Sequence, residues 1–250
     1  MAEGAQHFLD SFKDPEAVAR YTEGPKRFVP GLDGLHRMTG LLLAERVPAD
    51  AHILVLGAGG GSEMKAMAEA YPGWRFTGVD PAGPMLDLAA KVMGANTHRA
   101  DLVEGYIDDA PAGPFDGATC LLTLHFLERD ERIRTAAAIR ARLKPGAPFV
   151  AAHGSFPQGA DERDRWLDRY AAFAIASGGE PDQVAKGREA VATHVAMLSP
   201  EADVEVLRAA GFTGVEQFYA AFLLDPDGNN IEAVYHGEHE RSAPSVEVRF

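Results

Sequence analysis

Hydrophobic positions along the chain change repeatedly between short continuous runs and helical spacing. The first clear case is the apolar run 53–56, which leads through a glycine-rich turn into helical spacing from Ser62. This order predicts a strand, a tight turn and a helix. The same order recurs, with strands expected at 74–79, 97–102, 115–122 and 148–153 and helices at 84–94 and 130–143. Such alternation predicts an α/β fold with a Rossmann-like, doubly wound and mostly parallel sheet.

Two segments interrupt the alternation. Residues 1–45 are expected to be helical, with a break at 24–31, where the chain has two prolines and two glycines. A loop in that place could cover a bound ligand. Residues 154–200 carry apolar side chains at helical spacing, which predicts a helical lid insert in place of a further strand.

The end of the chain has the pattern of a β-hairpin. After a helix expected at 201–210, strands are expected at 215–224 and 231–236, on either side of the turn sequence 225–230. We expect this hairpin to be the antiparallel part of the main sheet. The expected parts of the chain are then an N-terminal cap at 1–45, a ligand-binding domain at 46–236 and a tail at 237–250.

Composition and charge limit what this chain can be. A length of 250 residues with 46% hydrophobic residues suits one sizeable core. The net charge of −13 argues against a large nucleic-acid surface, which needs clustered Lys and Arg. The sequence has neither an apolar run of membrane-spanning length nor the features of a signal peptide, so we expect a soluble cytoplasmic protein. The single Cys120 lies in an apolar run and is expected to fill the core.

The glycine-rich turn indicates a nucleotide-like ligand. Gly57, Gly59 and Gly61 lack a Cβ, so the backbone can come close to a bulky ligand and to the helix N-terminus. Asp80 ends the next expected strand, where sheets of this class hold ribose hydroxyls. NAD prefers G-x-G-x-x-G, but Ser62 stands in place of the last glycine, so the spacing favours S-adenosylmethionine (SAM). An NAD site and an ordinary glycine-rich loop are the alternatives.

Four further residues are candidates for contact with a substrate. His125 and His153 end two adjacent central strands of the expected sheet and would face the mouth of the site. Either imidazole could act as a base or as a hydrogen-bond donor, and a structural histidine is the alternative for each. Tyr21 and Arg27, in the N-terminal segment, could reach the same substrate. A core tyrosine and a solvent-exposed arginine are the alternatives for these two.

The order of the motifs resembles a known family. The first 224 residues are similar to class I SAM-dependent methyltransferases in the sequence of their glycine loop, Asp80, Asp101, Phe115-Asp116, Leu143-Lys144-Pro145-Gly146 and Ala210-Gly211-Phe212. Within that family, residues 27–31 and 122–128 resemble the R-x-V-P-G and F-T-L-Q-F-L-E segments of carboxy-SAM synthases, which have Gln where this chain has His125. The resemblance implies a cofactor site formed by Gly57, Ala58, Gly59, Gly61, Asp80, Pro81, Met85, Asp101, Leu102, Leu121, Leu122 and Thr123.

The same resemblance implies separate roles for these residues. The glycine loop would line the methionine and ribose side of SAM, and Asp80 would bind the ribose hydroxyls. Met85 would flank the adenine, and Asp101 with Leu102 would meet the adenine edge. Residues 121–123 would close the pocket.

The chain also departs from the family at two places. Class I enzymes often have an acidic residue two places before the first glycine, and this chain has Val55, which removes a polar anchor for the methionine end. Carboxy-SAM synthases carry an arginine in the insert for the extra carboxylate, and that position falls on Ala190, with Arg188 two residues away. Ordinary SAM is therefore the expected cofactor.

The last residues resemble a different family. Residues 225–234 are similar to the closing strands of vicinal oxygen chelate proteins, in which the position of Glu232 binds metal. A metal site needs several ligands converging from different strands, so we interpret Glu232 as a hairpin residue and expect no metal. Val246, Val248 and Phe250 alternate and could pair with a second subunit, which makes a homodimer an open option.

These observations favour a SAM-dependent methyltransferase that acts on a small-molecule acceptor, with His125 as the catalytic candidate. A SAM-dependent tRNA-modification enzyme of the carboxy-SAM synthase type is one alternative, although the acidic charge disfavours it. A non-catalytic SAM-binding regulator is another, because Val55 replaces the usual acid. An NAD-dependent dehydrogenase is the remaining alternative.

Overall fold

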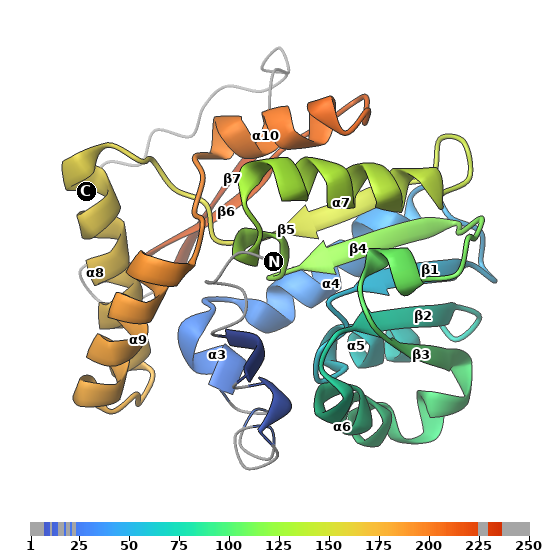
Figure 1. Cartoon of the computed structure of the whole chain (residues 1–250), viewed down its shortest axis with the longest axis horizontal. Helices are drawn as coiled ribbons and strands as arrows, with labels where there is room; N and C mark the ends of the chain where they lie inside the picture. Colours follow the sequence, from blue (N-terminus) through green and yellow to red (C-terminus); the bar gives the residue numbers. More distant parts are fainter. Residues whose placement is uncertain are drawn as a thin grey trace. The chain divides into compact units, whose positions relative to one another are not determined.

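The fold is known from a computed structural model, which describes residues 8–10, 12–14, 18, 21, 24–224 and 230–236. Five strands form the main sheet in the order β3-β2-β1-β4-β5, and all neighbouring pairs are parallel (Figure 1). The strands are β1 (His52–Leu56), β2 (Arg75–Asp80), β3 (Ala100–Glu104), β4 (Gly117–Leu121) and β5 (Phe149–Ala152). The predicted parallel α/β sheet is confirmed. Its strand order reverses between β1 and β4, where sheets of this class bind ligands.

Helices cover both faces of the sheet, and the central strands carry apolar side chains on both faces. Successive side chains of a strand point to opposite faces. In β1, Ile53 and Val55 therefore enter one core and Leu54 and Leu56 enter the other. The first core includes residues of α4 (Leu32–Ala44), α5 (Ser62–Ala70) and α6 (Gly83–Met93), and the second includes residues of α7 (Arg129–Ala141).

The expected helical insert is present as two helices that pack against each other. They are α8 (Ala160–Ala176) and α9 (Pro181–His194), followed by α10 (Pro200–Ala209). Ser155 and Leu198 pair as a parallel β-bridge, so the insert begins and ends at the same place beyond β5. Elsewhere, the described residues include three short 3₁₀ turns, which lie before β5: η1 (Gly94–Arg99), η2 (Ile107–Asp109) and η3 (Leu124–Phe126).

The prediction of a loop at 24–31 is wrong. Residues Gly24–Phe28 form the short helix α3, and the φ angle of 68° at Gly31 separates it from α4. The Phe28 ring lies 5.9 Å from the ring of Tyr170 on α8, so this segment packs against the insert. Glycine and proline therefore mark the ends of helices here and do not form an open loop.

The third strand lies further along the chain than expected. Thr97 Oγ1 donates to the carbonyl oxygens of Ala90 and Gly94, which holds η1 against the end of α6. The Arg99 guanidinium donates to backbone carbonyls 25 to 31 residues away. These bonds keep 94–99 in a 3₁₀ turn, and β3 begins only at Ala100.

The C-terminal residues form a separate compact unit that begins at Phe212. In it, β6 (Phe218–Leu224) and β7 (Asn230–His236) pair antiparallel, with Glu232 opposite Phe222. The turn at 225–229 and the tail at 237–250 lie outside the described residues. The place of this hairpin on the main sheet therefore stays a prediction. Among the helices of the described residues, none has the length and apolarity needed to cross a membrane.

Candidate active site

The glycine loop follows β1 and approaches two neighbouring segments closely. Gly57, Gly59 and Gly61 have φ angles of 75°, 48° and 79°, which side chains rarely adopt. A Cβ on Gly57 would collide with the Thr123 side chain, and one on Gly61 would lie 2.7 Å from Ala89 Cα. The sequence has glycine at these positions because neither the turn nor the close packing leaves room for a side chain.

Asp80 connects this loop to the loop that follows β2. Its Oδ2 accepts a hydrogen bond from the Gly59 N–H and its Oδ1 accepts one from the Ala82 N–H, each at 2.9 Å. Burial raises the pKa of the carboxyl, and the two N–H donors act in the opposite direction. Each carboxylate oxygen has a further lone pair, so the pair of oxygens could also accept from ribose hydroxyls. Pro81 lies between Asp80 and Ala82 and is half-buried.

Two tyrosines lie close enough to Asp80 for its negative charge to raise their pKa values. Burial, followed by the negative charge of Asp80, raises the pKa of Tyr21 to about 12 and raises that of Tyr106 as well. A Cβ built on Gly60 would lie 3.2 Å from the Tyr21 ring, which places this ring over the glycine loop. Tyr21 therefore lies beside the glycine loop, and its contact with a substrate stays a prediction. Tyr106 was not among the candidates.

Asp101 and Leu102 do not lie where the sequence placed them. Asp101 pairs with Thr77 near the start of β3 and is exposed. The premise that it ends the strand is wrong, because β3 continues to Glu104, which pairs with Asp80. Tyr106, two residues beyond the true end of this strand, was not considered for the same reason.

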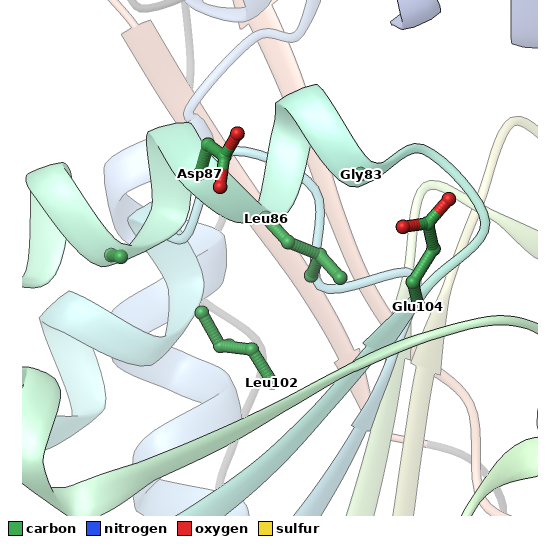
Figure 2. Close-up of a pocket in the computed structure, with 6 residues that line it drawn as sticks. Gly83, Leu86, Asp87, Leu102 and Glu104 are labelled. Atoms are coloured by element: carbon green, nitrogen blue, oxygen red, sulfur yellow. The ribbon is translucent and has the colours of Figure 1, made fainter.

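Leu102 lines an open groove between β3 and α6 (Figure 2). The residues around this groove are Gly83, Leu86, Asp87, Ala90, Leu102 and Glu104. In the close-up, Leu86 and Leu102 approach each other, and the Glu104 carboxylate lies beside the start of α6. Met85, on the same helix, is buried with Leu9, Val18 and Ala82, and its Cε is 3.7 Å from a Cβ built on Gly59.

The end of β4 faces the glycine loop. Leu121 is buried, and Leu122 has a φ of 55°, which is uncommon for a residue with a side chain. The Leu122 N–H donates to the Ala152 carbonyl oxygen at 2.6 Å. Thr123 Oγ1 donates to the Leu121 carbonyl oxygen at 3.0 Å, and its side chain meets Gly57. The chain therefore turns sharply at the switch point between β1 and β4, where such backbone strain often accompanies function.

His125 lies in η3, four residues beyond β4, and its hydrogen bond restricts its chemistry. Nδ1 accepts from the Gly154 N–H at 3.1 Å, so the proton of a neutral ring is on Nε2. Burial lowers the pKa of this imidazole to about 3, with further lowering by His153 and Arg132. His125 is therefore a neutral ring whose free nitrogen is a donor. Of the two roles expected for it, the structure favours donor over base.

His153 follows β5 and belongs to a buried ion-pair network. Its Nε2 lies 3.0 Å from Asp203 Oδ1, and the same oxygen accepts from Arg132 Nη1 at 2.8 Å. Arg132 is fully buried and also donates from Nε to the Leu127 carbonyl oxygen and from Nη2 to that of Ala196. The network joins α7, α10 and the end of β5. Arg27, by contrast, is exposed on α3.

Comparison with known proteins indicates the class of enzyme to which this site belongs. Residues 54–149 match the family described as "Methyltransferase domain". The matched domain is that of a SAM-dependent methyltransferase with the class I fold. The chain is 29% identical over 213 residues to the carboxy-S-adenosyl-L-methionine synthase of Chromohalobacter salexigens, a match that covers 82% of this chain and 78% of that protein.

Solved methyltransferase structures share the fold. PigF with S-adenosylhomocysteine (SAH) superimposes with a TM-score of 0.59 and 19% identity, over 85% of this chain and 58% of that chain. Human N-acetylserotonin methyltransferase in complex with SAM gives a TM-score of 0.56 and 17% identity, over 85% and 55%. The cofactor of this methyltransferase is SAM. Among the described residues, no three His, Cys, Asp or Glu side chains are grouped so that they could hold a metal.

Proposed function

We propose that this methyltransferase transfers the methyl group of SAM to a small-molecule acceptor held at the ends of β4 and β5. The observation that carries the proposal is the Asp80 carboxylate, which joins the glycine loop and the loop after β2 at 2.9 Å each. This preformed connection suits a single ribose over the loop. Residues 57–61 and 121–123 would line the methionine side of the cofactor, and Tyr106 would take the place first assigned to Asp101 and Leu102 beside the adenine.

The acceptor side supports a small substrate because the N-terminal segment covers it. Phe8 and Phe12 lie 5.1 and 6.4 Å from the ring of Phe126, the neighbour of His125. Phe12 also lies 5.8 Å from the ring of Tyr21, which is over the glycine loop. The described residues of this segment thus lie beside both the cofactor loop and the proposed acceptor side, as expected for an N-terminal cap at 1–45.

The sulfonium of SAM supplies an activated methyl group, and the protein then has to place the acceptor in line with it. His125 would donate its Nε2–H to the acceptor and fix its direction. His153 would help shape the same pocket wall, since its Nε2 is engaged by Asp203. Tyr21 and Arg27 remain candidates for acceptor contact, with Tyr21 the nearer of the two to the loop.

Calorimetric titration and product analysis test this proposal. We expect SAM and SAH to bind in preference to NAD, and a panel of hydroxyl, amine and carboxylate acceptors to reveal SAH release with at least one class. Tight binding of NAD without binding of SAM would refute the proposal. Binding of SAM without turnover of any acceptor would favour the non-catalytic regulator.

A carboxy-SAM synthase type of activity is the second candidate, favoured by the 29% identity to such an enzyme. Two observations count against it. Arg188 is engaged by Asp168 and Asp164 at 2.8 and 3.4 Å, and Ala190 offers no charge to a carboxylate. Mass spectrometry of the nucleoside that co-purifies with the protein separates the two candidates: SAM supports methyl transfer, and a carboxylated SAM supports the second activity.

A further inference from the structure

A buried carboxyl lies directly behind the glycine loop. Glu63 is the second residue of α5, and the loop residue Gly61 is the N-cap of that helix. Only 6% of Glu63 is exposed. Burial raises the pKa of this carboxyl to about 7, so at neutral pH a substantial fraction is charged despite its surroundings.

The surroundings of Glu63 leave this group incompletely matched. Thr119 faces it from β4 and partly offsets the effect of burial on the pKa. No contact between the two has hydrogen-bond geometry, and within the described part of the chain neither Glu63 Oε1 nor Thr119 Oγ1 has a partner. The Glu63 charge also adds to burial in raising the pKa of Cys120, the next residue of β4. The carboxyl thus lies next to the central strands with its Oε1 unpaired.

The position of the carboxyl relates it to Val55. Thr119 is the register partner of Val55, so Glu63 approaches the sheet at the pair Val55–Thr119. Gly57, which follows Val55 by two residues, begins the loop that approaches the cofactor. A carboxylate on α5 can therefore supply negative charge beneath the same loop, although β1 has only an apolar side chain there.

We propose that Glu63 is the anchor for the α-ammonium group in the methionine part of SAM, directly or through one bridging water. This rests on the proposed function, which places SAM over the glycine loop. Burial of an unmatched carboxylate disfavours the charged form, and an arriving ammonium would remove that cost. SAH has the same ammonium, whereas 5′-methylthioadenosine has the adenosine and thioether without the amino-acid end. Glu63 should thus distinguish these two ligands.

Titration calorimetry of the full chain with SAH and 5′-methylthioadenosine tests the proposal. Glu63→Gln should weaken SAH binding about ten- to a hundredfold, because the ammonium loses a charged acceptor, and should leave methylthioadenosine within about twofold. Glu69→Gln is the matched control. Glu69 is on the same helix, is exposed and pairs only loosely with Lys65 at 3.9 Å, so neither affinity should change.

Relocating the charge sharpens the test. Val55→Asp in the Glu63→Gln background should recover part of the SAH affinity without changing that for methylthioadenosine. In the unaltered protein, SAH affinity should fall as the pH drops below about 7, since Glu63 must be charged to attract the ammonium, and Glu63→Gln should lose this dependence.

Three outcomes would overturn the proposal. Unchanged SAH affinity in Glu63→Gln would show that the carboxyl does not contact the ammonium. Equal weakening of both ligands, with lower thermal stability, would assign Glu63 to the fold alone. If the unaltered protein bound no SAH, the proposed function would fail and this inference with it, whereas the first two outcomes leave that function intact.

Discussion

The proposed cofactor half and the proposed acceptor half of this site are held together by different kinds of contact. Around the glycine loop, the contacts are backbone N–H groups and one carboxylate, and they connect residues that follow each other from β1 to β2. At the ends of β4 and β5, Arg132 reaches Asp203, which is 71 residues further along the chain. The first half is built by local sequence, and the second depends on the insert returning to the sheet.

The largest effect that should separate the two halves is on stability. Arg132→Met leaves Asp203 buried beside His153 without its arginine partner, so we expect the free energy of unfolding to fall by about 3–5 kcal/mol. Arg134→Met is the control, because Arg134 is an exposed residue of the same helix that pairs with Glu131 and Asp108, and it should cost less than about 1 kcal/mol. Chemical denaturation measures both.

A double replacement then identifies the cause. If the loss comes from an unpaired buried charge, Arg132→Met with Asp203→Leu should recover much of the stability, since apolar residues avoid the desolvation cost. Equal destabilisation by the single and double variants would instead mean that the shape of the side chains matters more than their charges.

The cofactor half should respond in affinity more than in stability. Asp80→Ala should weaken SAM binding by about 1–3 kcal/mol, because ribose hydroxyls lose a charged acceptor and the loop loses the bonds to Gly59 and Ala82. Asp101→Ala is the matched control, and it should bind SAM normally because Asp101 is exposed near the start of β3. A loss with Asp101→Ala and none with Asp80→Ala would overturn the ribose role of Asp80 and return a cofactor contact to Asp101.

The sequence predicted β1, the glycine loop and β2 well because their signals are local. An apolar run, three glycines and an aspartate at the end of the next strand lie within 53–80, and the sheet bears them out in order and direction. It misplaced β3 because the segment before that strand is held by Arg99 bonds to carbonyls 25 to 31 residues away. No local pattern contains that information.

The acceptor half was predicted only as far as its histidines. His125 and His153 were placed near strand ends, but the tautomer of the first depends on the Gly154 N–H, and the engagement of the second depends on Asp203. Asp203 itself looks like an ordinary residue in the first turn of a helix. Its role is visible only when α10 packs against α7.

The hydrogen-bonding role of His125 gives the next prediction. His125→Ala should lower the rate of methyl transfer about tenfold or more and leave SAM affinity nearly unchanged, because a donor that orients the acceptor is lost. His125→Gln should retain much of the activity, since a glutamine amide can donate from a similar position. Equal loss in both variants would favour a base, which Gln cannot replace. Steady-state kinetics gives the rate, and calorimetric titration gives the SAM affinity, of the unaltered protein and of both variants.

The smallest expected effect concerns Tyr106, which lies two residues beyond the corrected end of β3. It is 39% exposed and lies close enough to Asp80 for the carboxylate to raise its pKa. If its ring is one wall of the nucleoside site, Tyr106→Ala should weaken SAM and methylthioadenosine alike, by about 0.5–1.5 kcal/mol, and Tyr106→Phe should keep the affinity because the ring remains. This pattern differs from that of Glu63, where only the ligand with an ammonium should respond. Normal affinity in Tyr106→Ala would place the adenine elsewhere, and the wall beyond β3 would then have to come from a different residue.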